Sequence, residues 1–285
     1  MLHILGVSRS PRFSPNSADR DAALFAAVVS RLRRWGHEVS IISEDLFVSV
    51  DLQSFDVVFS MARSRYVVDC LSEAETEGGL CVVNSARALA SATRAKLMQA
   101  FEAAGVPQPP FCTLAADPAA ADRVPVPFPY WLKRSEACAQ TPADVVYVEN
   151  RGAAVEALGQ FAARGVGEVV AVQHAEGDLV KFYGVAGTDF FRCSYPTAEG
   201  GFSKFGLEEH NGRPQGYAFD EAALKLLAGR AAEASGFSVY GGDAVVRPDG
   251  SLALIDFNDW PSFSPCRREA AKAIAAAICA APVTQ

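Results

Sequence analysis

One predicted β-hairpin near the end of the chain sets two aspartates against each other, and this pairing constrains the fold more than any other feature. The segment DAVVRPDGSLALIDFN carries the dipeptide Asp249-Gly250, a strong signal for a two-residue hairpin loop. Counting outward from such a loop pairs Val245 with Leu254. The same count pairs Asp243 with Asp256, so two carboxylates face each other in strands that are otherwise apolar.

The count also adds an amide to these carboxylates. Asn258 falls opposite Gly241, and side chains alternate with period two, so Asp243, Asp256 and Asn258 share one face. Opposed carboxylates repel each other, and a divalent cation removes the repulsion. Ligands that are all oxygen favour Mg²⁺ or Mn²⁺ over zinc. The residues alone leave one alternative, in which one aspartate faces solvent and the other caps a turn.

The first third of the chain alternates strand and helix signals. A helical spacing over Asp19–Trp35 ends at Gly36, a typical residue after a helix. Strands separated by helices predict a parallel α/β sheet, whose carboxyl ends face a ligand crevice. The expected strands are Leu2–Val7, Glu38–Ile42, Phe55–Ser60 and Leu80–Asn84.

Two loops at the expected carboxyl ends of these strands are basic. The first holds Arg9 and Arg12, and the second holds Arg63 and Arg65. The planar guanidinium group binds carboxylate or phosphate well, so the pair of loops could bind a small anionic substrate. Taken singly, each arginine is better explained as solvated surface, and the two loops together leave that explanation and an anionic substrate equally open.

The remaining two thirds predict an α+β arrangement. Arg87–Ala104 reads as one helix that ends at Gly105, before a proline-rich boundary. We expect three units, with an N-terminal α/β domain at 1–85, a linking helix and central lobe at 86–173, and a C-terminal lobe at 174–285. The further expected elements are strands Tyr130–Lys133, Val145–Val148 and Glu168–Gln173, helices Ala153–Ala163 and Asp220–Ser235, a hairpin over 179–195 and a terminal helix.

The earlier hairpin supplies cations. A loop centred on Gly187-Thr188 sets Arg192 opposite Tyr183, with Lys181 as the diagonal neighbour on the same face. Two cations beside a metal-carboxylate site are what phosphoryl transfer requires, because negative charge spreads over the transferred phosphate oxygens.

Composition excludes several classes. The 285 residues carry a net charge of −7, which argues against nucleic-acid binding. Seven cysteines without zinc spacing, and an N-terminal apolar run too short for a signal peptide or membrane span, are typical of a cytoplasmic protein that does not bind membranes. The phosphate-loop, dinucleotide and serine-hydrolase motifs are absent.

Four segments together resemble the ATP-grasp superfamily in order and spacing. They are TRAKLMQAFEAAGVPQP, PYWLKRSEACAQ, VVAVQHAEGD and VYGGDAVVRPDGSLALIDFNDWP, and they cover roughly residues 85 to 275. The resemblance implies a fold in which two lobes hold ATP between them after a preceding α/β domain. It also implies Mg²⁺-ATP as the cofactor.

The resemblance assigns roles to individual residues. Lys96 and Lys133 would bind ATP phosphates, with Lys181 also near the nucleotide. Gln173 and His174 would lie near the adenine. The further implied positions are Glu176 or Asp178 at the ribose, Asp243, Asp256 and Asn258 at the metal, and Ser135 or Ala139 in a loop over the phosphates. His210 is a candidate substrate contact for another reason: it falls in an irregular segment that could cover the pocket.

Three departures from the family pattern stand out. The loop after Lys133 contains no glycine, the metal carboxylate at Asp256 is more often glutamate, and His174 occupies a position that is commonly acidic.

Two reactions share such machinery. The favoured one is a carboxylate–amine ligase that forms an acyl phosphate, with Arg192 and Lys181 stabilising the transferred group. The alternative is a kinase acting on a polyol or inositol phosphate, because VKFYGV and IDFNDWP resemble segments of the superfamily's inositol-phosphate kinases. The least favoured is a nucleotide-binding protein without catalysis. We expect a monomer or homodimer.

Overall fold

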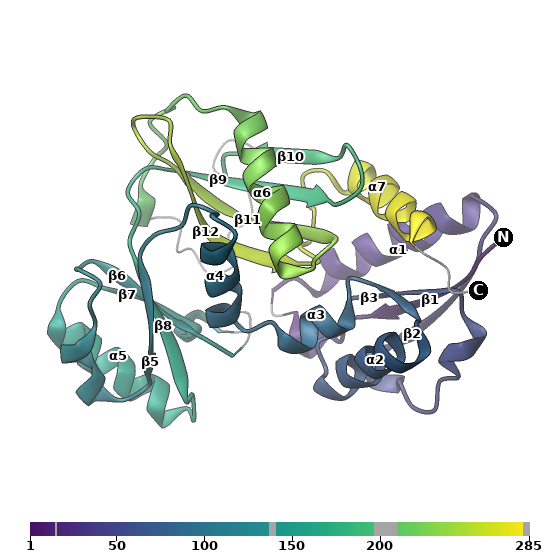
Figure 1. The fold of residues 1–285 in the computed structure, drawn as a ribbon, viewed down its shortest axis with the longest axis horizontal. Helices are drawn as coiled ribbons and strands as arrows, with labels where there is room; N and C mark the ends of the chain where they lie inside the picture. Colours follow the sequence, from purple (N-terminus) through teal and green to yellow (C-terminus); the bar gives the residue numbers. More distant parts are fainter. Residues whose placement is uncertain (15, 137–140, 197–209, 282–285) are drawn as a thin grey trace.

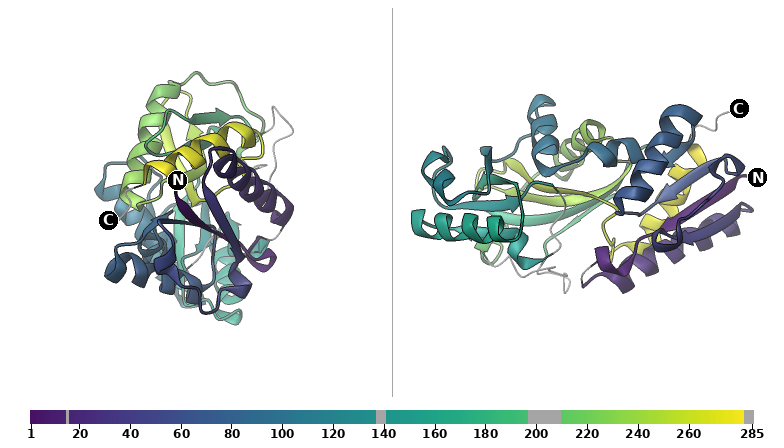
Figure 2. Two further views of the ribbon diagram at one scale, coloured as in Figure 1. Left: turned by 90° about the vertical axis from the view of Figure 1, so that its right-hand side faces the viewer. Right: turned by 90° about the horizontal axis from the view of Figure 1, so that it is seen from below.

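Three four-stranded sheets follow one another along the chain (Figure 1). The computed structural model describes residues 1–14, 16–136, 141–196 and 210–281. The first sheet belongs to an N-terminal domain, the second to a central lobe and the third to a C-terminal lobe. Figures 1 and 2 show the N-terminal domain at one end of the molecule and the central lobe at the other.

The N-terminal sheet is parallel, in the order β2-β1-β3-β4. Its two faces bury different side chains, because neighbouring residues of a strand point to opposite sides. Ile4 and Phe59 pack with helices α1 and α7, whereas Leu5 and Val58 pack with α2. The bounds are β1 His3–Ser8, β2 Glu38–Ser43, β3 Val57–Ser60, β4 Cys81–Val83, α1 Ala18–Arg34, α2 Arg65–Gly78 and α7 Arg267–Ala280.

The central lobe is an antiparallel sheet in the order β5-β8-β6-β7. Helix α5 packs against it, and Ala95 and Met98 of helix α4 (Arg94–Ala103) pack against Val170 and Val172 of β8. The sequence analysis found three of these strands and helix α5 but not β5. The bounds are β5 Phe111–Ala115, β6 Tyr130–Arg134, β7 Val145–Val148, β8 Glu168–Gln173 and α5 Arg151–Ala163.

The C-terminal lobe is a second antiparallel sheet, in the order β10-β9-β11-β12. Helices α4 and α6 share a core cluster with it, in which Phe101 of α4 lies with Leu227 of α6 and Phe257 of β12. The bounds are β9 Asp178–Val185, β10 Phe191–Ser194, β11 Val239–Val246, β12 Leu252–Asp259, α4 Arg94–Ala103 and α6 Glu221–Ser235.

The expected single helix over 87–104 is two helices, α3 (Ala86–Ser91) and α4. The chain breaks because Thr93 acts as a new N-cap, accepting a hydrogen bond from the backbone N–H of Lys96 at 3.3 Å. Arg94 therefore becomes the first residue of α4, and its backbone N–H donates to the carbonyl of Ser135 at 2.7 Å. The break docks the start of α4 against the end of β6.

The hairpin formed by β11 and β12 has the predicted pairing near the trio Asp243, Asp256 and Asn258, but a different pairing near its loop. Asp243 pairs with Asp256 and Gly241 with Asn258, as predicted. Val245, however, pairs with Ala253, because the loop contains three residues, Pro248–Gly250, and the N–H of Arg247 bonds the carbonyl of Ser251 at 2.9 Å. The predicted two-residue loop was wrong.

A β-bulge restores the register between these two regions. The pairing shifts between Asp243 and Ala244, which leaves Ile255 as the extra residue on β12. The extra residue in the loop shifts the strand pairing by one position, and the extra residue in β12 shifts it back. The other hairpin has its predicted pairing, with Arg192 opposite Tyr183.

The fold-class prediction is confirmed, since a parallel α/β domain precedes two lobes with antiparallel sheets. Among the described residues, no helix is both long and apolar enough to span a membrane.

A buried asparagine ties the N-terminal domain to the C-terminal lobe. Asn84 follows β4, and its amide oxygen accepts from the N–H of Val239 at 2.6 Å while its amide nitrogen donates to the Val239 carbonyl at 2.8 Å. That carbonyl also accepts from the N–H of Trp260 at 3.1 Å. The ends of β4, β11 and β12 therefore meet at one point.

Replacing Asn84 with alanine tests this junction. The buried N–H of Val239 would lose its acceptor, so we expect the free energy of unfolding to fall by about 1–3 kcal/mol. Chemical denaturation measures the change, with exposed Gln99→Ala as the control that should be nearly neutral. Equal stability of the Asn84 variant and wild type would contradict the assigned role.

Candidate functional site

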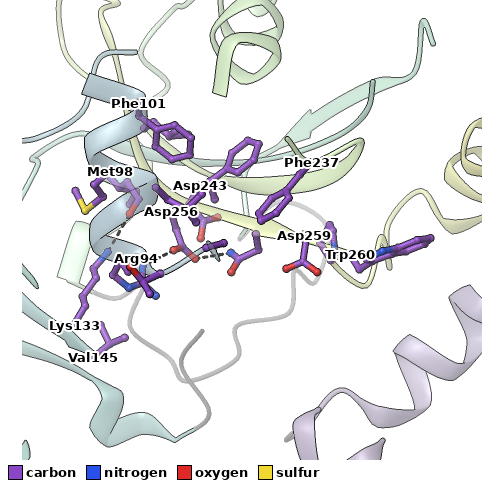
Figure 3. A pocket seen from close by; sticks show the side chains of 18 of the residues that line it. Arg94, Met98, Phe101, Lys133, Val145, Phe237, Asp243, Asp256, Asp259 and Trp260 are labelled. Carbon is purple, nitrogen blue, oxygen red and sulfur yellow. Dashed lines mark hydrogen bonds and ion pairs between the residues drawn. The ribbon is translucent and has the colours of Figure 1, made fainter. Parts of the chain in front are cut away.

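A cavity of about 570 Å³ collects side chains from all three sheets. Lys133 enters from β6 of the central lobe, Asp243 from β11 of the C-terminal lobe, and Arg63 from the loop after β3 (Figure 3 shows the first two). A volume of this size is typical of small-molecule sites.

The predicted trio lies on the wall of this cavity. Asp243, Asp256 and Asn258 all line it, and the Asn258 amide donates to Oδ2 of Asp256 at 2.7 Å. Their donor set consists of two carboxylates and one amide. No cluster of three or more His, Cys, Asp or Glu side chains suited to a metal occurs among the described residues.

Such a set suits Mg²⁺ or Mn²⁺, which are typically bound by one or two carboxylates and take their remaining ligands from water and phosphate. The three side chains therefore fit a hard cation that arrives with a phosphate-bearing ligand. The metal role of the trio stays a prediction.

Each carboxylate of the trio has a cationic partner. Nη1 of Arg94 lies 2.8 Å from Oδ1 of Asp256, and Nζ of Lys181 lies 3.0 Å from Oδ1 of Asp243. Burial raises the pKa of the Asp256 carboxyl, but Arg94, Lys133 and the hydrogen bond from Asn258 outweigh that effect and hold the pKa below its usual range. Asp256 is therefore ionised at neutral pH and available as a ligand.

Lys133 reaches the same place from the central lobe. Its Nζ donates to the carbonyl of Ile255, the bulged residue, at 3.0 Å. Burial and, to a lesser extent, the charge of Arg94 together lower the pKa of Lys133 to about 8, against the opposing influence of Asp256 and Asp243. The bulge thus both restores the strand register and presents a carbonyl to a buried lysine.

Lys96 does not join this group, although the sequence analysis assigned it to phosphate. Its side chain is exposed and does not line the cavity. Arg94 lines the cavity instead, because the cap at Thr93 starts α4 two residues before Lys96. A threonine at the capping position was the signal in the sequence that could have found this arginine.

The loop after Lys133 is only partly described. Ser135 is buried, and its hydroxyl donates to Oε1 of Glu168 at 2.7 Å, so it supports the strand end rather than facing the cavity. Ala139 lies outside the described residues.

The predicted base-binding pair lies at the cavity's far end. Gln173 and His174 both line it, and Nδ1 of His174 accepts from the indole N–H of Trp131 at 3.1 Å. The rings of Tyr147 and His210 stack nearby, with centroids 4.2 Å apart. His210 was predicted to contact the acceptor, but its ring packs at this aromatic end and does not line the cavity.

The two acidic residues proposed for the ribose take other positions. Glu176 is exposed and outside the cavity lining. Asp178 is buried and accepts hydrogen bonds from three successive backbone N–H groups, those of residues 215 to 217. Asp178 therefore anchors the segment before α6.

Two predicted cations also lie elsewhere. Arg192 is exposed and forms an ion pair with Glu269 at 2.7 Å, and Arg12 forms one with Asp45 at 3.1 Å. Neither lines the cavity. Sequence spacing correctly placed Arg192 on its strand but could not reveal that α7 supplies its partner.

The cavity end next to the N-terminal domain holds three of the predicted arginines, each paired with an aspartate. Arg9 pairs with Asp21 at 2.8 Å and Arg63 with Asp259 at 2.6 Å, both in buried positions. Arg65 also lines the cavity, and its exposed side chain pairs with Asp69 of α2.

A buried glutamate holds the two basic loops together. Oε1 of Glu44 accepts from the N–H of Ser10 at 2.6 Å, and Oε2 accepts from the N–H groups of Arg63 and Ser64 at 2.8 and 2.6 Å. The sequence analysis missed this residue. Because Glu44 follows β2, the carboxyl ends of β1, β2 and β3 form one rigid wall.

Solved structures share this architecture over nearly the whole chain. A RimK domain protein ATP-grasp from Sphaerobacter thermophilus is 19% identical, with a TM-score of 0.68, covering 97% of this chain and 99% of that chain. The chain has the ATP-grasp fold. D-alanine–D-alanine ligase from Bacillus anthracis complexed with ATP is 12% identical, with a TM-score of 0.64 and coverage of 98% and 97%.

No protein-family model and no curated protein matches the sequence. The ATP-grasp assignment therefore comes from the fold, and it confirms the resemblance found in the four sequence segments.

The position of Lys133 can be tested by its titration. We expect one lysine to titrate near pH 8, well below the usual value, because burial and Arg94 disfavour its charged form. The charge is present below that pH and is lost as pH rises through it. NMR of isotope-labelled lysine follows the titration, and the signal should vanish in Lys133→Met. A Lys133 signal that titrates with the exposed lysines would contradict its burial.

Proposed function

We propose that the protein is a Mg²⁺-ATP-dependent ligase that joins a carboxylate to an amine through an acyl phosphate. The observation that carries the proposal is the convergence of Arg94, Lys133 and Lys181 on the face of Asp243 and Asp256 in one cavity. Cations that surround paired carboxylates between two lobes are suited to a nucleotide triphosphate and its metal.

The nucleotide would lie along the cavity from the aromatic end to the trio. Gln173 and His174 would contact the base, and Lys133 and Arg94 the phosphates. Arg94 replaces Lys96 in this role. The fold shared with a ligase structure complexed with ATP supports a nucleotide here.

Asp243, Asp256 and Asn258 would hold the metal. Bound there, Mg²⁺ would offset phosphate charge and orient the phosphates for in-line transfer. Arg94 and Lys181 at present neutralise the two carboxylates, so metal binding frees both cations to turn toward phosphate oxygens. In the hairpin of β9 and β10, Lys181 would then contact the transferred group, because Arg192 forms an ion pair with Glu269 outside the cavity.

The reaction has two steps. A substrate carboxylate oxygen attacks the γ-phosphorus, the bond to the bridging oxygen breaks, and ADP leaves. An amine then attacks the acyl carbon, phosphate leaves with the bonding electrons, and the amine loses a proton as the amide forms. Lys181 and Arg94 would stabilise the charge on the phosphoryl oxygens in the first step.

The four arginines of the two basic loops give the kinase alternative only weak support. All four are paired with aspartates: Arg9–Asp21, Arg12–Asp45, Arg63–Asp259 and Arg65–Asp69. A site for a polyphosphorylated ring needs uncompensated positive charge, whereas a carboxylate needs only one well-held guanidinium group.

Trapping with hydroxylamine separates the two reactions. A ligase that forms an acyl phosphate should release ADP and give a hydroxamate when a pool of small carboxylic acids is supplied with hydroxylamine. A kinase should release ADP with polyol phosphates and no amine. ADP release that occurs only with polyol phosphates would overturn the ligase proposal.

A matched pair of variants tests the phosphate site. Arg94→Met should weaken Mg²⁺-ATP binding by roughly tenfold or more, because a charge-assisted contact to phosphate is lost. Lys96→Met, two residues away on the same helix, should leave the affinity unchanged because its side chain is exposed. Isothermal titration calorimetry measures both dissociation constants.

The opposite pattern, with weaker binding only in Lys96→Met, would restore the family-based assignment and refute the one drawn from the geometry. Equal thermal unfolding temperatures of the two variants serve as the control for folding.

A further inference from the structure

Asp259 has one carboxylate oxygen without a partner among the described residues. Its side chain is 3% exposed, and Oδ1 lies 2.6 Å from Nη2 of Arg63. Oδ2 is buried and accepts no hydrogen bond from any described group. Asp259 also lines the cavity, beside the metal trio, and Figure 3 shows it between Asp256 and Trp260.

Burying such an oxygen costs free energy unless a hydrogen-bond donor contacts it. Buried polar atoms in native proteins are nearly always hydrogen-bonded, and a buried carboxylate oxygen left unpaired carries a desolvation penalty. An exception that lines a ligand cavity indicates that the ligand supplies the donor.

The backbone prevents Asp259 from turning out to solvent. The next residue, Trp260, is fully buried against Phe59 of the N-terminal core, with ring centroids 6.2 Å apart. Its N–H also bonds the carbonyl of Val239 at 3.1 Å. The end of β12 is therefore fixed on both sides, and Arg63 alone satisfies only half of the carboxylate.

The charged side chains at this end of the cavity also indicate which kind of ligand could supply a donor to Asp259. Three arginines line this end of the cavity, and each is paired with an aspartate: Arg9 with Asp21, Arg63 with Asp259, and the exposed Arg65 with Asp69, which itself lies outside the lining. A balanced wall disfavours a polyanion and favours a ligand that carries both charges. Because Oδ2 can only accept, the group that meets it must be a donor, and a cation is preferred.

We propose that the carboxylate substrate bears a primary ammonium group, and that Oδ2 of Asp259 binds it. The inference rests on the proposed ligase function and adds the class of substrate, a zwitterionic amino acid or short peptide. Asp259 thereby acts as a specificity-determining residue. Its other oxygen keeps Arg63 in place at the cavity wall.

The test uses hydroxylamine as the amine, so only the carboxylate has to be varied. ADP release is measured with α-amino acids and dipeptides, and with the N-acetylated and des-amino form of each. Wild-type protein should use the ammonium-bearing forms with at least about 30-fold higher kcat/KM, the minimum expected from a buried charge pair.

Asp259→Asn keeps the shape and removes the charge. The variant should lose most of this preference through a higher KM for the ammonium-bearing forms, while its affinity for Mg²⁺-ADP stays as in wild type; its unfolding temperature should fall, because Arg63 loses its buried counter-charge. Asp45→Asn is the matched control, because it breaks the Arg12 ion pair outside the cavity and should leave the preference intact.

Different outcomes overturn different claims. Equal use of the acetylated or des-amino forms by wild-type protein would refute the ammonium site and leave the ligase proposal standing. An equal loss for both substrate classes in Asp259→Asn would make the residue merely structural and refute its role in specificity. Turnover of no carboxylate would contradict the ligase proposal itself.

Discussion

The pairing of Asp243 with Asp256 across β11 and β12 is the constraint on which the rest of the site depends. Two carboxylates at opposed positions in a half-buried sheet need positive charge close by. Lys181 supplies it from β9, Arg94 from the start of α4 and Lys133 from β6. The same electrostatic requirement thus draws together both lobes and the helix between them, and it shapes a cavity suited to phosphates.

The N-terminal domain lines the cavity with arginines from two loops. Its arginines are held by carboxylates, and Glu44 locks the two loops that present them. Asp259 belongs to β12, directly after the trio, yet it pairs with Arg63 of the N-terminal domain. The proposed acceptor site therefore lies at a junction where adjacent residues of one strand belong to the proposed metal site and to the proposed substrate site. That continuity explains why the strand end must be as firmly fixed as it is.

The sequence correctly predicted the features that depend on local periodicity, such as strand pairing. It did not predict the contacts that depend on how separate elements pack together. The Asp243–Asp256 pairing was predicted correctly, although a longer loop and a bulge had to offset each other for it to hold. Lys96 was assigned to phosphate because the family pattern has a lysine there, whereas the cap at Thr93 places Arg94 on the cavity wall and leaves Lys96 exposed. The partners of Arg63 and Arg192 come from other elements and leave no trace in spacing, whereas Arg65 pairs with Asp69 four residues along the same helix. The fold class needed only the order of strands and helices.

The central claim, that the Asp243–Asp256–Asn258 face binds the metal of a metal–nucleotide complex, is tested most directly by crystals grown with Mn²⁺ and a non-hydrolysable ATP analogue. Anomalous scattering locates Mn²⁺ independently of any assumption about ligands. The account predicts a peak within bonding distance of all three side chains, with phosphate oxygens completing the coordination and Arg94 turned toward phosphate. A nucleotide bound in the cavity with Mn²⁺ away from this face, or a face still closed by Arg94 and Lys181, would contradict it.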